Sequence, residues 1–466
     1  MTRYLVLLAV MPSLCSSAAS AYTAQACVKI QVTYTDSDPT WTLTNGVKED
    51  NWKEQTRLRP PYGASYLITR GGTAVASGNL GDGFAPGVPA GCTANFEVPA
   101  SVTHIMWVWS EGLVQSNHLV SQAPNRSSRI AAATFIPTAT PFDVNITLVG
   151  SDDHDTEVLS DVFYAYVAGS YALFRHAGGE VGNWYYYYRC DCAVSGSSCV
   201  VAGNQYGDCS CAGTPPDGCY VEGGNKTNQS LTNPDGTWWV SSMKPEGDNT
   251  KFMLIHELGH QLAHSITNGN ANGGNCNYAG GHPCDAAGSG AHAMWSVENA
   301  NCAYDEAFAN FYSADVWNSH SQQDCAYKYS LWNIDTQYTW QLRHGPMIDC
   351  AADDGPDPGT ARDDFTNGQN AEAAHPMEAS WFDKCPDPSM SYVSTEVDWT
   401  RVFWGIHTDG ASPPSFTAIG QWLRDCGPVG VDTAYWDLDA CAENAPGTLN
   451  ANWNANVPAT GHNIDQ

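Results

Sequence analysis

The sequence has few basic residues: 20 Lys and Arg stand against 49 Asp and Glu, which gives a net charge of −29 at pH 7. Nucleic acid and anionic lipid surfaces would both repel such a chain. We therefore expect neither nucleic acid nor a membrane as a partner. The acidity fits a soluble exported protein, and the sequence carries no signal for an oligomeric state.

Long apolar runs are also missing. The run at residues 4–11, YLVLLAVM, is much shorter than the about 20 apolar residues that span a bilayer, and no later stretch qualifies. Arg3 before it and the small residues at 19–21 after it match a secretory signal peptide, predicted for residues 1–21. The expected location is therefore extracellular. A weak lipoprotein-type pattern at residues 24–27 leaves a lipid anchor as an alternative.

No two cysteines have the C-x-x-C spacing, although the chain contains 17 cysteines. One, Cys15, lies in the predicted signal peptide, so 16 remain for an oxidising compartment, and eight disulfides are their expected use. Cys27 and Cys92 are a candidate pair. Six cysteines crowd into residues 189–219, which predicts a disulfide-stapled insertion. A second zinc cluster is the alternative there, and the missing C-x-x-C pairs disfavour it.

Composition predicts a multidomain chain with one boundary near residue 150. Residues 22–150 contain short alternating or β-branched runs separated by turn residues, typical of an antiparallel, all-β, sandwich-like module, either a retained accessory or a propeptide. From Asp155 apolar residues recur at helical spacing, so a helix-containing domain is predicted over residues 151–446. The Asn-rich residues 447–466 have little to bury and are expected to form a loosely held polar tail.

The most informative pattern is H-E-x-x-H, at His256, Glu257 and His260. The His and Glu content predicts only about 0.013 chance matches in a chain of this length. Apolar residues at three- and four-residue steps predict a helix here, and positions i and i+4 of a helix share one face. Both imidazoles can therefore reach one metal ion. Gly259 costs such a helix about 1 kcal/mol relative to Ala, which indicates that something packs closely against its backbone.

A catalytic zinc usually has three protein ligands, so a third must come from elsewhere in the chain. Glu306 is one of only two glutamates between the motif and residue 371. A second helix is predicted over residues 305–317, which would turn Glu306 toward the histidines. Asn310, one turn later, could accept the free ring N–H of a ligand histidine and fix its tautomer. The predicted ligands are His256, His260 and Glu306. The alternatives for the third are Glu298, Asp305 and His292.

These elements resemble the gluzincins, thermolysin-like zinc metallopeptidases with H-E-x-x-H on one helix and a distant glutamate on the next. The sequence E-A-F-A-N at 306–310 is similar to their E-x-x-x-D element, with Asn310 where Asp is common. The resemblance covers about residues 236–320 and implies an α+β zincin-like fold, one catalytic Zn²⁺ and a protein or peptide substrate. GTWWVSSM, residues 236–243, lies where gluzincins have the edge strand that lines their cleft.

A mechanism follows from this ligand set. Zinc would lower the pKa of a water molecule, and Glu257 would take its proton and pass it to the leaving amine. A His or Tyr donor is expected to stabilise the oxyanion that forms. By analogy with thermolysin-like enzymes, His375 is the candidate donor because it lies downstream of the third ligand. His407 and Tyr312 compete with it, and a structural role for His375 stays open.

Expected walls of the substrate cleft are aromatic, and the net charge disfavours acidic peptides. These walls are Trp238, Trp239, Phe308 and Tyr312. The Asp-rich stretch 349–368 could bind Ca²⁺, although no segment has the EF-hand pattern and a solvated acidic loop is the simpler interpretation.

Two other classes of function are left open. One is a secreted binding or adhesion protein with a degenerate peptidase scaffold, which the intact Glu257 disfavours because a structural metal needs no base. The other is a zinc amidase that acts on a non-peptide or cell-wall amide.

Overall fold

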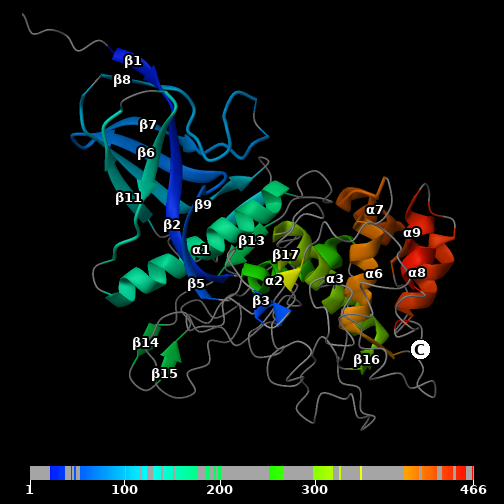
Figure 1. The fold of residues 1–466 in the computed structure, drawn as a ribbon. Helices are drawn as coiled ribbons and strands as arrows, with labels where there is room; N and C mark the ends of the chain where they lie inside the picture. The colour runs from blue at the N-terminus through cyan, green and yellow to red at the C-terminus, as the bar shows by residue number, and fades with distance from the viewer. Residues whose placement is uncertain are drawn as a thin grey trace, which may run out of the picture.

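The structure is a computed structural model. Figure 1 shows the β-strands of the first part of the chain and the helices of the later part. The described residues are 21–36, 43–44, 47–48, 53–84, 86–99, 101–114, 118–122, 130–137, 140–150, 153–175, 185–188, 193–195, 198–200, 251–266, 297–317, 325–326, 347–348, 393–408, 412–427, 433–443, 445, 448–457 and 464.

The first part of the chain consists of β-strands, as its alternating pattern predicts. They are β1 (Ala21–Ala24), β2 (Ala26–Asp36), β3 (Leu43–Thr44), β4 (Val47–Lys48), β5 (Lys53–Arg59), β6 (Ala64–Arg70), β7 (Thr73–Asn79), β8 (Phe96–Pro99), β9 (His104–Val114), β10 (His118–Gln122), β11 (Ile130–Phe135) and β12 (Phe142–Ile146). In β9, every second side chain from His104 to Val114 is buried. This period of two gives the sheet one face that must be covered.

The larger sheet has the order β13-β10-β9-β6-β7, with β11 beside β9, and a second sheet has the order β12-β2-β5. Strands β1 and β8 pair separately. An antiparallel module was expected, but β12 runs parallel to β2, and β13 (Tyr185–Tyr188) runs parallel to β10. Since β13 follows residue 150, a segment beyond the expected boundary completes the sheet. Three short pairs also form: β3 with β4, β14 (Ala193–Ser195) with β15 (Ser198–Val200), and β17 (Cys325–Ala326) with β18 (Met347–Ile348).

Helix α1 (Asp153–Arg175) joins the strands to the helices. It packs against β2 and β9 on one side and against α2 on the other (Figure 1). The Tyr166 hydroxyl donates to the backbone carbonyl of Tyr62 at 2.8 Å, and the Tyr62 ring stacks on Phe174 with centroids 4.5 Å apart. Buried side chains form one continuous core from the sheets through α1 into the later helices.

The remaining helices are α2 (Lys251–Ile266), α3 (Ala300–Trp317), α6 (Glu396–Thr408), α7 (Phe416–Cys426), α8 (Ala434–Ala442) and α9 (Thr448–Asn456). Two short antiparallel strands, β16 (Val297–Asn299) and β19 (Val393–Thr395), run directly into α3 and α6. Their pairing sets the starts of these two helices side by side. Phe308 and Phe311 of α3 then pack against Phe403 of α6, with ring centroids 5.7 Å apart in each pair.

The expectation of a loosely held tail is wrong for residues 448–457. Helix α9 buries Trp453, whose indole N–H donates to Asp439 at 2.8 Å. Asn452 donates its side-chain amide to the carbonyl of Ile406 at 2.8 Å, so it satisfies a backbone group of α6. The polar composition of this segment gave no sign of a helix, because α9 is held by the buried ring of Trp453 and by hydrogen bonds from asparagine side chains.

The expected Cys27–Cys92 disulfide is confirmed, and a second one joins Cys426 of α7 to Cys441 of α8. Most of the Cys-rich insertion lies outside the described residues, and so do the expected edge strand at 236–243 and the acidic stretch at 349–368. Within the part of the chain that the structure describes, no helix is long and apolar enough to cross a membrane.

Candidate metal centre

Helix α2 carries both motif histidines on its buried side. Ile255, Leu258 and Leu262 are in the core, which orients the helix as its spacing predicts. His256 and His260 retain only 2% and 7% of their surface exposed. Their rings lie 4.6 Å apart at 89°, so two nitrogens one helical turn apart point to a common place.

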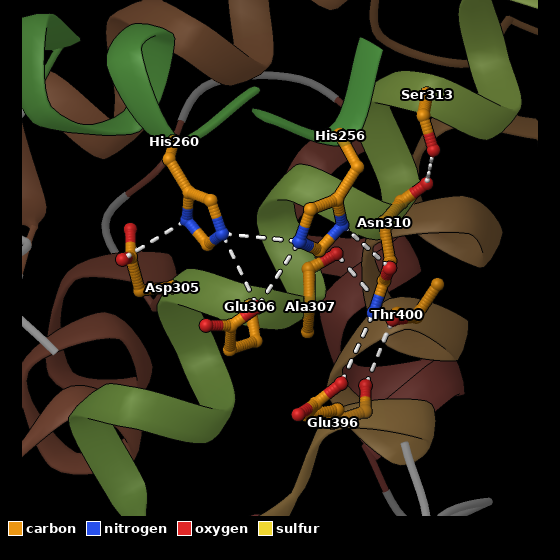
Figure 2. A network of polar contacts seen from close by, with 9 residues as sticks. All are labelled: His256, His260, Asp305, Glu306, Ala307, Asn310, Ser313, Glu396 and Thr400. Carbon is orange, nitrogen blue, oxygen red and sulfur yellow. Dashed lines mark hydrogen bonds and ion pairs between the residues drawn. The ribbon is translucent and has the colours of Figure 1, made fainter. Parts of the chain in front are cut away.

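Helix α3 brings Glu306 to the same place, as the sequence predicts. Its Oε2 lies 3.1 Å from Nε2 of His256 and 3.2 Å from Nε2 of His260, and the two nitrogens are 3.0 Å apart (Figure 2). Three Zn²⁺ ligands at tetrahedral angles would have edges of about 3.3 Å. This buried triangle of two imidazoles and a carboxylate therefore could hold a metal ion, and its donor set fits zinc.

The two helices are in unusually close contact here because of Gly259. A Cβ at this position would lie 2.6 Å from Cα of Ala309 on α3. The sequence-based inference of a close partner at Gly259 is confirmed, and the partner is the backbone of the helix that carries Glu306.

The outer ring nitrogens of the histidines also have partners. Nδ1 of His256 lies 2.8 Å from Oδ1 of Asn310, so the expected contact between Asn310 and a motif histidine is present. Nδ1 of His260 lies 3.2 Å from Oδ2 of Asp305, a partner that the sequence analysis considered only as an alternative ligand. Both contacts suit N–H donation from Nδ1, and an imidazole in that form can offer the lone pair of Nε2 to a metal ion.

Asn310 is itself held by a third helix. Its Nδ2 donates to Oε2 of Glu396, the first residue of α6, at 3.3 Å (Figure 2). Glu396 retains only 2% of its surface exposed. Sequence reasoning missed this residue, because nothing in its spacing connects it with the motif.

The electrostatics of the cluster favour positive charge. Burial alone would lower the pKa of His260, but the carboxylates of Glu306 and Asp305 outweigh burial and raise it well above its ordinary value of 6.5. A place that stabilises a proton so strongly also suits a divalent cation, which would displace that proton on binding.

The other residues named from the sequence fall into two groups. Glu257 lies on α2 between the histidines, but its side chain is outside the described part, as is all of His375. His407 does not belong to the cluster: its ring contacts Asp315, about 13 Å along α3 from Glu306, and the carbonyl of Pro414.

The expected cleft walls from α3 are also corrected. Phe308 and Tyr312 are 0% and 1% exposed and pack against the aromatic rings of α6 and α7. Both are core residues, so neither can line a substrate cleft, and Tyr312 is not placed to stabilise an oxyanion.

Comparisons of the chain with protein-family models, with curated proteins and with solved structures found no match. The function of this cluster must therefore follow from its own chemistry.

Proposed function

We propose that this protein is a secreted zinc metallopeptidase. The convergence of His256, His260 and Glu306 carries the proposal, because it joins the two ends of the H-E-x-x-H motif to a glutamate 46 residues downstream. Within the described residues the cluster offers three ligands, the number typical of catalytic zinc, whereas structural zinc sites usually have four. This count favours catalysis over the alternative of a binding protein with a structural metal.

Zinc, when bound, would supply a Lewis acid that polarises the scissile carbonyl and acidifies water. The chain's own residues would do the rest. The three ligands would hold the ion with Nε2 and carboxylate donors, and Asn310 and Asp305 would keep both imidazoles in the Nδ1–H form. Glu257, next to His256 on α2, would accept a proton from the attacking water and deliver it to the nitrogen of the departing amine.

The substrate class is proposed on charge and site chemistry. A net charge of −29 favours neutral or basic segments of protein over acidic ones. Two of the four aromatic residues expected to form the substrate pocket, Phe308 and Tyr312 of α3, are buried in the core. A preference for apolar residues beside the cut therefore depends on Trp238 and Trp239 alone.

The decisive experiment is hydrolysis of an unfolded protein by the purified chain, with chelator and with zinc restored. Glu257→Gln should keep one zinc per chain and the fold, while hydrolysis falls by about 100-fold to 10,000-fold because only the proton carrier is lost. Glu443→Gln is the matched control, since Glu443 is an exposed residue at the end of α8.

Comparable hydrolysis by Glu257→Gln and the unaltered protein would refute the peptidase proposal. If the unaltered protein binds zinc and cleaves no peptide, a panel of cell-wall and other amides would distinguish the amidase from the binding protein.

A further inference from the structure

A buried carboxylate that is not a candidate ligand lies behind the metal centre. Glu396 begins α6 and is 2% exposed, and its Oε2 accepts a hydrogen bond from Nδ2 of Asn310 at 3.3 Å. The start of a helix stabilises negative charge through its unpaired N–H groups. The pairing of β19 with β16 fixes where this helix starts relative to α3. The fold thus holds the carboxylate of Glu396 against the amide of Asn310.

The hydrogen bond to Glu396 determines which way the amide of Asn310 faces. A carboxylate only accepts hydrogen bonds, so the amide must present its NH₂ group to Glu396. Its carbonyl oxygen then faces Nδ1 of His256 at 2.8 Å. That oxygen only accepts, so Nδ1 must carry the proton, and Nε2 is left with a lone pair that it can offer to a metal ion.

We propose that Glu396 is a positioning residue that acts on the metal through Asn310 and holds His256 in its metal-binding tautomer. This inference rests on the metal centre of the proposed function. His260 has a carboxylate, Asp305, in direct contact with its Nδ1, whereas His256 has a neutral amide there. Glu396 supplies the missing anion one residue further out, from a third helix. The three-helix arrangement in Figure 2 follows this path from α2 through α3 to α6.

A relocation of the charge tests the proposal. Glu396→Gln keeps the shape of the side chain but can present either an oxygen or an NH₂ group, so the orientation of Asn310 is no longer enforced. We expect zinc affinity, measured by competition with a chelator, to fall by about 10-fold to 100-fold. Asn310→Asp alone would place two buried carboxylates about 3.3 Å apart and should also weaken the site.

The double variant Asn310→Asp/Glu396→Gln moves the anion into direct contact with His256 and gives it an amide donor at position 396. It should recover zinc affinity to within about threefold of the unaltered protein, although each single variant is impaired. If Glu396 served only in packing, the losses of zinc affinity in the two single variants would add up in the double variant. Nitrogen NMR of the histidine rings in the zinc-loaded protein should show protonated Nδ1 of His256 in the unaltered and double variants.

Ser394→Ala is the control, because Ser394 is a buried, uncharged residue of β19, the strand that leads into Glu396, and its hydroxyl oxygen accepts a hydrogen bond from the Trp399 indole. It should keep full zinc affinity. Unchanged affinity in Glu396→Gln, or a double variant no better than Glu396→Gln, would overturn the inference. If Glu396→Gln does not fold, the double variant decides alone: zinc binding supports the inference and its loss overturns it. A protein that binds zinc but cleaves nothing would refute the proposed function and leave this inference standing.

Discussion

Replacement of Gly259 by alanine should force α2 and α3 apart where the candidate ligands converge. The added Cβ would lie 2.6 Å from Cα of Ala309 and 3.1 Å from both its Cβ and its carbonyl oxygen. Neither a backbone atom nor a methyl group can rotate out of the way. The helices must therefore separate by about 0.8 Å to reach ordinary van der Waals contact.

Two effects of opposite sign set the change in stability. Alanine is better than glycine inside a helix by about 1 kcal/mol. Overpacking a close contact costs about 1–3 kcal/mol, so the net loss should be at most about 2 kcal/mol. The metal site should suffer more, because Gly259 directly precedes His260 and Ala309 lies three residues after Glu306. A shift of about 0.8 Å would stretch the distances from Oε2 of Glu306 to the two histidine nitrogens to about 4 Å, beyond the edge of about 3.3 Å in a tetrahedral zinc site.

We expect Gly259→Ala to weaken zinc binding by about 10-fold to 100-fold, comparable with the loss of an outer-shell contact. Chelator competition measures the affinity, and urea unfolding of the metal-free protein measures the stability. Gly420→Ala is the matched control: it is also a helical glycine, but its Cβ would meet only the flexible end of Ile266 at 3.4 Å. Full zinc affinity in a folded Gly259→Ala protein would refute the reasoning.

Three further predictions concern the ligands, pH and the β-strands. Alanine at any one of the three ligand positions should abolish the single zinc per chain, measured by elemental analysis; full occupancy without Glu306 would move the third ligand elsewhere. Burial alone would lower the pKa of His407, but Asp315 and the carbonyl of Pro414 outweigh burial and the opposing charge of Arg175 and raise it. The resulting stabilisation is complete below about pH 6.5 and disappears as pH rises through the raised pKa, so His407→Gln should flatten the pH dependence of urea unfolding; an unchanged slope would contradict this. A fragment of residues 151–466 should fail to give a sharp unfolding transition, because α1 would lose the β-strands that it packs against. The secreted protein should therefore begin near Tyr22. A start near Asp152 with full activity would instead identify residues 22–150 as a propeptide.

The centre of the site was predictable because its geometry is encoded over short distances. His256 and His260 share a helix face by spacing alone, and the buried stripe of α2 sets which face it is. Glu306 could be found because glutamate is scarce in this part of the chain. Asn310 follows it by one turn and therefore reaches the same histidines. Each step uses one helix or a pair of adjacent helices.

The supporting carboxylates were harder to find, for two different reasons. Asp305 adjoins Glu306, and its contact with His260 could have been anticipated from the wide acidic edge that two consecutive acids give a helix. Glu396 lies 86 residues beyond Asn310, and the pairing of β16 with β19 brings them together. Two strands of three residues carry no sequence signal strong enough to predict that pairing.

The errors at Phe308, Tyr312 and the C-terminal tail have a common physical origin. Periodicity and composition report how much apolar surface an element offers, but they do not report what will cover it. The aromatic face of α3 is covered by α6 and α7 rather than by substrate. In α9 one ring is enough: a buried tryptophan removes about 150–250 Å² from water, worth several kcal/mol, and Trp453 has Trp422 and Tyr435 to pack against. Asparagines beside it cost little because they donate to backbone carbonyls, as Asn452 does to α6. A segment that is polar on average can therefore be held firmly, provided that its few apolar atoms are concentrated in one side chain and its amides meet acceptors.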